Sequence, residues 1–354
     1  MTFLYFMLLL GVLIFVHELG HFLAARSVGM RVEKFYMGFN LFGIGIKKKW
    51  GETEYGIGLF PLGGYVKVSG ILDESMDPSS TGADYEYQSK NALQQIWFAS
   101  AGVIMNFLLA IIIFTGIVYH IGVRVQDERA IVGEVIPDYP AQSVGITSGD
   151  LILSVNGKKI SSWAEMTELI HPIIDQTVIL EIERNGIIIT DTLVTTTSQS
   201  YIDGELKLVG MVGIAPIVEI VPTTLFQAVG EGFSLTSDWL VIIFDSLKMI
   251  ATGEASFKEI GGPIMIAKLT GESVRNGFLS FLNFMAIISI NLAFINILPI
   301  PAMDGGHIVV SVLEGVSRRK LPTKVKMGVQ QVGVLILLLL FVFVMFNDIS
   351  RLFQ

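Results

Sequence analysis

The chain has 354 residues, of which 52% are hydrophobic and only 16% are charged. Soluble proteins carry about 25% charged residues, and the mean hydropathy of this chain is +0.64, so an entirely soluble or a disordered protein is excluded. The net charge of −8 argues against a nucleic-acid partner, which needs a basic binding face. The absence of cysteine excludes disulfides, thiolate metal ligands and cysteine nucleophiles.

Four stretches are long and apolar enough to cross a bilayer, which needs roughly 20 residues of helix. The expected spans are about 3–25, 93–122, 279–302 and 327–347. No basic residue precedes the first span and no small-residue cleavage site follows it, so we expect it to be retained rather than removed as a signal peptide. Lys and Arg gather between spans one and two and between spans three and four, which predicts that both termini lie outside the cytoplasm.

A different pattern, of short strands and turns, occupies about 125–200 in the long segment between spans two and three. We expect a strand at 131–136, a helix at 163–171 behind a capping box, and a hairpin that joins 177–184 to 187–194. The run A-x-x-x-G-I-x-x-G-D-L-I-L-S-V-N-G at 141–157 resembles a PDZ domain of the bacterial protease type. This resemblance implies a peptide groove between the 131–136 strand and the 163–171 helix. An empty groove that acts as a steric gate is the alternative.

His17-Glu18-Leu19-Gly20-His21 is an H-E-x-x-H motif inside the first span. Positions i and i+4 of a helix share a face, so both imidazoles can bind one metal ion. Glu18 is then placed to act as general base on a metal-bound water. Ionisable residues at membrane depth are costly and indicate function; histidines that are simply solvated at a helix end are the alternative interpretation.

A catalytic zinc needs a third protein ligand and one open position. The candidates are the carboxylates and the three other histidines, His120, His171 and His307. Asp304 is the most distinctive carboxylate because Pro299 and Pro301 break the helix before it and Gly305-Gly306 let the backbone bend close to a neighbour after it. A helix-capping Asp at the surface is the alternative for this residue.

The H-E-x-x-H motif together with N-x-x-P-x-P-x-x-D-G-G-H at 296–307 resembles the site-2 protease family of intramembrane metalloproteases. The resemblance covers essentially the whole chain and points to the bacterial regulator-of-sigma-E protease group, here with a single PDZ domain. A family pattern in the second span, A-G-P-x-x-N-F, is matched at 101–107 except that Val103 replaces the proline. The resemblance implies that His17, His21 and Asp304 are the zinc ligands. It also implies that Glu18 is the catalytic base. It also implies substrate contacts by three amides: Asn106, Asn291 and Asn296.

The predicted fold is an α-helical polytopic membrane protein with four transmembrane helices, a membrane-reentrant β-sheet and one inserted extracytoplasmic PDZ domain. The reentrant sheet, which the resemblance implies, is expected at about 34–69. The predicted N-terminal membrane half covers 1–124 and the PDZ domain covers 125–200. A connector with an interfacial amphipathic helix follows at 201–275, and the C-terminal membrane half covers 276–354.

The resemblance implies an intramembrane zinc endopeptidase of the bacterial inner membrane that performs regulated intramembrane proteolysis. Its substrates would be single-span membrane proteins, such as anti-sigma factors or signal-peptide remnants, and a peptide ligand of the PDZ domain is a further expected partner. Iron or cobalt could bind the same ligand set. A catalytically silent receptor that binds peptides through its PDZ domain is the alternative function, although it has no need of four polar groups at membrane depth. An ion-coupled transporter is disfavoured by four spans without an inverted repeat.

Overall fold

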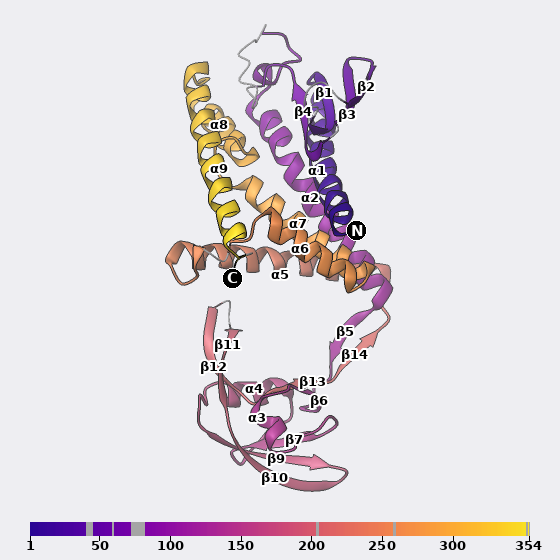
Figure 1. The fold of residues 1–354 in the computed structure, drawn as a ribbon, viewed down its shortest axis with the longest axis vertical. Helices are drawn as coiled ribbons and strands as arrows, with labels where there is room; N and C mark the ends of the chain where they lie inside the picture. Colours follow the sequence, from indigo (N-terminus) through magenta and orange to yellow (C-terminus); the bar gives the residue numbers. More distant parts are fainter. Residues whose placement is uncertain are drawn as a thin grey trace. The chain divides into compact units, whose positions relative to one another are not determined.

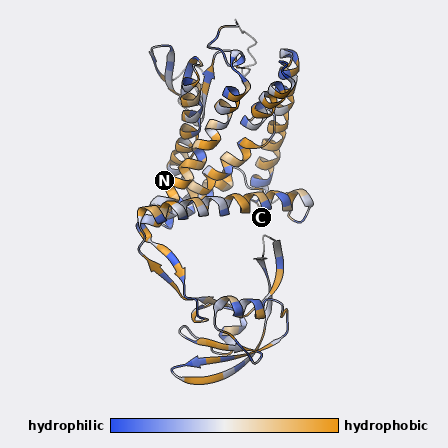
Figure 2. Cartoon of the chain, turned by 180° about the vertical axis from the view of Figure 1, so that it is seen from behind, coloured by the Kyte–Doolittle hydropathy of each residue, from blue (hydrophilic) through white to orange (hydrophobic). Residues whose placement is uncertain are grey.

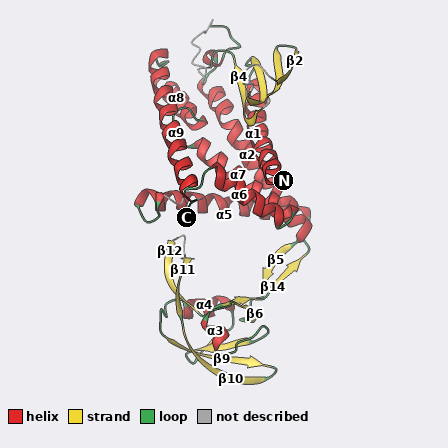
Figure 3. Ribbon diagram, in the orientation of Figure 1, coloured by secondary structure: helices red, strands yellow, loops and turns green. Residues whose placement is uncertain are grey.

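The computed structural model describes residues 1–39, 45–58, 60–71, 82–202, 205–257, 260–351 and 353. The chain divides into two compact units, one formed by Met1–His120 with Thr224–Gln354 and the other by Ile121–Thr223. We call them the membrane unit and the PDZ-like unit. Helices make up most of the membrane unit, and strands make up most of the PDZ-like unit (Figures 1 and 3).

Four helices of the membrane unit are long and apolar enough to cross a bilayer: α1 (Thr2–Ser27), α2 (Ala92–Ile121), α7 (Phe278–Ile297) and α9 (Thr323–Arg351). Hydrophobic residues run along their length (Figure 2). The four predicted stretches are therefore confirmed as helices. However, α7 ends at Ile297, five residues before the expected end, because Pro299 disfavours helical backbone at Leu298 and cannot donate a helical hydrogen bond.

Close packing holds three of these helices together. One buried cluster joins α1 to α7 and a second joins α2 to α7: Leu9, Leu13, Phe281 and Met285 in the first, and Ala110, Phe114, Ala286 and Ile290 in the second. Gly20 brings α1 against α2, since a Cβ at this position would lie 2.4 Å from the backbone oxygen of Ala101. Small residues at such crossings are how membrane helices approach closely, and here they bring the H-E-x-x-H turn to the side of α2.

A four-stranded sheet follows α1, with strand order β2-β3-β1-β4. Its strands are β1 (Val32–Phe39), β2 (Gly45–Trp50), β3 (Thr53–Gly58) and β4 (Phe60–Val68). β1 runs parallel to β3 and antiparallel to β4, so β4 is an edge strand of the described sheet, and it packs on α1. The sheet lies within the expected 34–69 region, of which 40–44 and 59 are outside the described residues. That it enters the membrane stays a prediction.

Among the described residues, the membrane unit has four further helical segments: η2 (Tyr87–Ser89), α5 (Leu225–Thr252), α6 (Pro263–Arg275) and α8 (Asp304–Ser317). Thr224 and Gln227 form a reciprocal capping box that starts α5. Large apolar side chains on α5 are exposed, among them Phe226 and Phe233. A helix with such a face is typical of a membrane interface, and the interfacial position predicted for this connector stays a prediction.

The PDZ-like unit contains ten strands and two short helices among its described residues. They are β5 (Val123–Gln126), β6 (Val132–Val135), α3 (Pro140–Ser143), β7 (Leu151–Val155), β8 (Lys158–Lys159), α4 (Trp163–Ile170), β9 (Thr177–Arg184), β10 (Ile187–Val194), β11 (Thr196–Ile202), β12 (Glu205–Met211), β13 (Ile214–Pro216) and β14 (Val218–Val221). The β9–β10 hairpin has the predicted bounds. The unit extends to Thr223, beyond the expected boundary at 200, because β13 and β14 pair back with β6 and β5.

The predicted peptide groove beside the 131–136 strand is wrong. β6, which forms this strand, pairs antiparallel with β13. The backbone of Val132 also donates to the carbonyl of Asp150 and accepts from the amide of Gly149. Within the described residues, β6 therefore has no continuous free edge to which a peptide strand could add.

Candidate metal centre

Three side chains from two helices converge on one point. His17 and His21 lie one turn apart on α1, and their Nε2 atoms are 3.3 Å apart. Asp304, the first residue of α8, places Oδ2 3.3 Å from His17 Nε2 and Oδ1 3.3 Å from His21 Nε2. Ligands of a tetrahedral zinc, at bond lengths of about 2.0–2.1 Å, lie about 3.3–3.4 Å apart. One ligand atom from each of the three residues lies within 4.8 Å of the other two, so this candidate metal cluster is close enough together to bind a single ion.

The environment of these groups also fits a cation. Asp304 Oδ2 is buried and makes no hydrogen bond with the described residues, and a buried carboxylate oxygen is costly unless a positive charge compensates it. His21 is 7% exposed, and its Nδ1 lies 2.9 Å from the Phe98 carbonyl oxygen. Because a carbonyl only accepts, Nδ1 carries the proton and Nε2 keeps its lone pair for a metal. Two imidazoles and one carboxylate, with a position left open, are a donor set that suits zinc.

The loop before α8 explains how Asp304 reaches this point. The two prolines of the run keep 298–303 out of helical conformation, and α8 begins at Asp304. A Cβ on Gly305 would lie 2.1 Å from the backbone oxygen of Leu298, and one on Gly306 would lie 2.5 Å from a backbone oxygen of the loop. The expectation that these glycines allow a close backbone approach is thus confirmed, and the neighbour is the loop itself.

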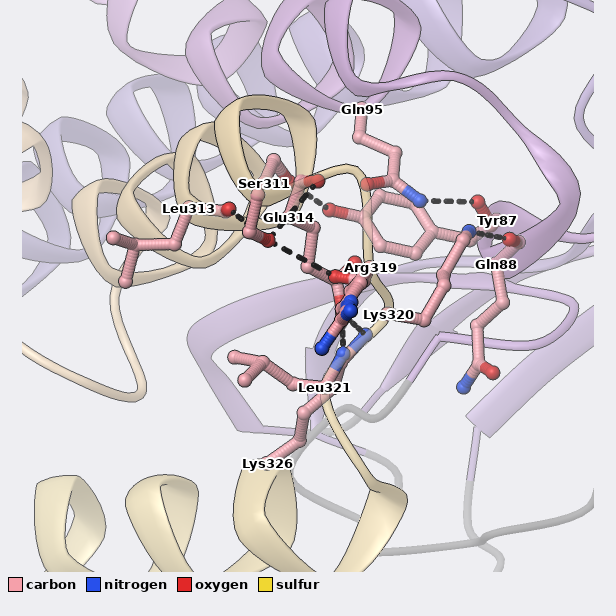
Figure 4. A network of polar contacts seen from close by, with 11 residues as sticks. Tyr87, Gln88, Gln95, Ser311, Leu313, Glu314, Arg319, Lys320, Leu321 and Lys326 are labelled. Atoms are coloured by element: carbon pink, nitrogen blue, oxygen red, sulfur yellow. Dashed lines mark hydrogen bonds and ion pairs between the residues drawn. The ribbon is translucent and has the colours of Figure 1, made fainter.

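A polar network fixes α8 to the start of α2 and to α9 (Figure 4). The hydroxyls of Tyr87 and Ser311 are 3.2 Å apart, and Gln95 donates to the Tyr87 carbonyl at 2.9 Å. Glu314, which is 5% exposed, forms an ion pair of 2.6 Å with Lys326. The network stabilises the helix that presents Asp304. Sequence reasoning missed it, because its central contact joins Tyr87 and Ser311, which are 224 residues apart and belong to no motif.

Glu18 lies between the two histidines on α1 and beside the edge strand β4. A Cβ on Gly64 of β4 would lie 3.2 Å from Glu18 Cγ and 3.0 Å from Ile14 Cγ2. The backbone of an edge strand therefore passes directly next to the predicted catalytic base.

The three predicted substrate-contacting amides occupy different environments. Asn106 is fully buried on α2, with Nδ2 3.3 Å from His17 Nδ1. Asn291 and Asn296 are half-buried on α7 and make no hydrogen bond with the residues that the structure describes. Substrate contact by all three amides stays a prediction.

Gly102 is a site residue whose role is visible only in three dimensions. A Cβ at this position would lie 2.5 Å from His21 Nε2 and 2.6 Å from His17 Cε1. α2 therefore packs its bare backbone against both imidazoles. In the sequence, this contact is signalled only by the Ala-Gly pair of the 101–107 pattern. The pattern does not indicate that the glycine packs against the two histidines.

An H-E-x-x-H helix completed by a distant carboxylate, with a glutamate at the centre, defines the class of metal-dependent peptidases. The sequence profile of peptidase family M50 matches residues 5–340, and the chain belongs to this family. A Clostridium perfringens (strain 13 / Type A) protein is 37% identical over 99% of this chain and 98% of its own length. A Helicobacter pylori (strain J99) protein is 35% identical over 98% of each chain. Both are named "Putative zinc metalloprotease".

The comparisons identify zinc as the cofactor and the chain as an integral membrane protease. Among solved structures, the PDZ domain of an SdrC-like protein from Listeria monocytogenes matches 27% of this chain and 94% of that domain. Its sequence identity is 24% and its TM-score is 0.22.

Proposed function

We propose that this protein is an intramembrane zinc metalloendopeptidase that cleaves single-span membrane proteins in regulated intramembrane proteolysis. The observation that supports this most strongly is the convergence of Asp304 with His17 and His21, two residues on an apolar helix of spanning length. Polar groups at membrane depth are costly and are kept for function. We place the enzyme in the bacterial inner membrane, with both termini and the PDZ-like unit outside the cytoplasm.

The residues around the centre divide the chemistry among them. His17, His21 and Asp304 would hold the zinc, which when bound polarises a carbonyl and acidifies water. Glu18 takes a proton from the attacking water and delivers it to the leaving amine nitrogen. Two half-buried amides on α7, Asn291 and Asn296, would hydrogen-bond the substrate backbone or the developing oxyanion.

The sheet supports a way to bind a transmembrane substrate. A membrane-spanning helix satisfies its own backbone hydrogen bonds and offers none to a protease. An unwound segment could instead pair with the edge strand β4, whose Gly64 lies against Glu18. The substrate class we infer is therefore a single helix that can be unwound locally, rather than a folded soluble domain.

The test compares Glu18→Gln with the wild type in detergent, using a single-span model substrate and measuring zinc per chain. We expect wild-type cleavage, a loss of at least about 100-fold in Glu18→Gln because the general base is removed, and zinc retained in both. Glu52→Gln, an exposed site in the turn between β2 and β3, is the matched control. Cleavage by Glu18→Gln at the wild-type rate would contradict the proposal. Zinc-free wild-type protein that cleaves nothing would favour the peptide-binding receptor.

A further inference from the structure

The two zinc-ligand histidines differ in how their second ring nitrogen is held. His21 Nδ1 donates to the carbonyl of Phe98, a group that accepts only, so its tautomer is fixed with Nε2 free. The neighbour of His17 Nδ1 is the side-chain amide of Asn106, at 3.3 Å. An amide can either donate or accept, so the tautomer of His17 depends on how this amide is turned.

The surroundings of Asn106 decide between the two orientations. If Asn106 Nδ2 donates to His17 Nδ1, Nδ1 has no proton and the neutral imidazole carries its proton on Nε2. Nε2 faces Asp304, and once protonated it has no lone pair with which to bind a metal. That orientation also leaves Asn106 Oδ1 buried without a hydrogen-bond partner among the described residues. A half-turn of the amide exchanges two nearly isosteric atoms. It gives Oδ1 the donor that it lacks and frees Nε2 of His17 for the metal.

The position of Asn106 is well suited to such a role. The residue is 0% exposed, and Ser289 Oγ of α7 donates to its backbone oxygen at 2.8 Å. One turn earlier on α2, Gly102 lies against the same imidazole. The amide is therefore fixed by packing and has little freedom to reach a substrate.

We propose that Asn106 is a positioning residue for His17: its Oδ1 accepts a hydrogen bond from His17 Nδ1–H and so holds the imidazole in the tautomer that binds zinc through Nε2. This inference rests on the proposed zinc ligands. It gives Asn106 a role toward a metal ligand instead of toward the substrate. Such partners of ligand histidines typically contribute about 10–100-fold to metal affinity.

The test measures zinc affinity by chelator competition, without any activity assay. Asn106→Leu removes the acceptor, and we expect its zinc affinity to fall by about 10–100-fold. Asn106→Asp keeps an acceptor at the same place but cannot donate, and we expect it to bind zinc at least as tightly as the wild type. Asn283→Leu, an exposed amide on α7, is the matched control and should leave zinc affinity unchanged.

Two results would overturn the proposal while leaving the zinc site intact. Equal losses in Asn106→Asp and Asn106→Leu would show that the amide acts as a donor. Unchanged affinity in Asn106→Leu would show that it has no role toward His17. Wild-type protein that binds no zinc would instead contradict the zinc site itself, and the inference with it.

A measurement on the zinc-free wild type avoids the risk that a variant fails to fold. The chain has five histidines, so ¹⁵N-histidine labelling can resolve each ring, with His17→Gln used for assignment. We expect neutral His17 to carry its proton on Nδ1. A proton on Nε2 would overturn the proposal.

Discussion

At Gly102, α2 packs against both ligand imidazoles with no side chain between them. A Cβ there would lie 2.5 Å from His21 Nε2, so Gly102→Ala must displace the rings. We expect zinc affinity to fall by at least about tenfold, the range seen when residues that support metal ligands are lost. Chelator competition measures this.

The control for this change is Gly116→Ala on the same helix, where nothing lies within 4 Å of the added Cβ. It should leave zinc affinity unchanged and raise helix stability by up to about 1 kcal/mol. If Gly102→Ala binds zinc as Gly116→Ala does, the close approach of α2 to the ligands is not as described.

Sequence reasoning recovered the local part of the site and left the long-range part open. The i, i+4 spacing of His17 and His21 is sufficient to predict a shared helix face. The third ligand lies on another helix, so spacing alone left several histidines and carboxylates as candidates, and it was the family resemblance that pointed to Asp304, which the structure brings beside both histidines. The contacts of Gly102 and Asn106 with the histidines depend on how two helices cross, which no spacing within one helix encodes.

At the scale of elements, Asp348 near the end of α9 binds the start of α6. Its carboxylate is buried and accepts hydrogen bonds from the backbone amides of Gly262, Ile264 and Met265 at 2.9, 2.8 and 3.2 Å. These amides belong to the first turn of α6 or precede it, where amides lack a partner in their own helix. The Gly261-Gly262-Pro263 stretch thus has a structural role, which its sequence alone did not reveal.

Asp348→Ala would leave these buried amides unsatisfied, at a cost of about 1–3 kcal/mol. We expect a lower midpoint of thermal unfolding in detergent. Ser350→Ala is the control, since this hydroxyl bonds the Phe346 carbonyl of its own helix, and its midpoint should stay near that of the wild type. Equal midpoints for the two variants would contradict the assignment.

In the PDZ-like unit, an ion pair ties the turn before β7 to β9. Arg184 donates from Nε and Nη2 to the two carboxylate oxygens of Asp150, both at 2.7 Å, and the amide of Thr147 donates at 2.8 Å. Burial alone would raise the pKa of Asp150, but these hydrogen bonds outweigh it and lower the pKa below its ordinary value. The pair therefore stabilises the fold above about pH 4, and this stabilisation is lost as the pH falls through the folded-state pKa.

Arg184→Ala should destabilise this unit at neutral pH by about 1–3 kcal/mol, because it leaves a buried charge without its partner while the arginine itself is partly solvated. The acid dependence of its stability should also become shallower. Both the loss of stability and its pH dependence can be measured in the full chain from the hydrogen-exchange rates of β7 and β9 amides, each corrected for the intrinsic exchange rate. Arg129→Ala, which breaks an exposed pair with Asp127, should change little. Similar exchange in the two variants would contradict this account.

At the scale of the whole molecule, the predicted orientation can be read with single cysteines, since the chain has none. Asn185→Cys lies in the β9–β10 turn, and Arg319→Cys lies between α8 and α9; both sites are exposed. With a membrane-impermeant maleimide and intact cells made permeable only in the outer envelope, we expect label at 185. Label at 319 should require lysis of the cytoplasmic membrane. The reverse pattern would overturn the topology.

Hydropathy and local turns predicted much of the architecture, and the peptide groove and the end of the PDZ-like unit were missed because they depend on non-local strand pairing. The four apolar stretches became α1, α2, α7 and α9, and the Asn185-Gly186 turn gave the β9–β10 hairpin its register. The groove beside β6 failed because its partner β13 is some 80 residues further along the chain. Strand pairing across such a distance leaves no periodic signal in either strand.

The measurement that tests the zinc site most directly is X-ray absorption at the zinc edge of the purified, zinc-loaded protein. We predict one zinc per chain with two imidazole ligands and one carboxylate, and the loss of one oxygen ligand in Asp304→Ala. A spectrum with three imidazoles would contradict the account, because it would require another histidine in the place of Asp304.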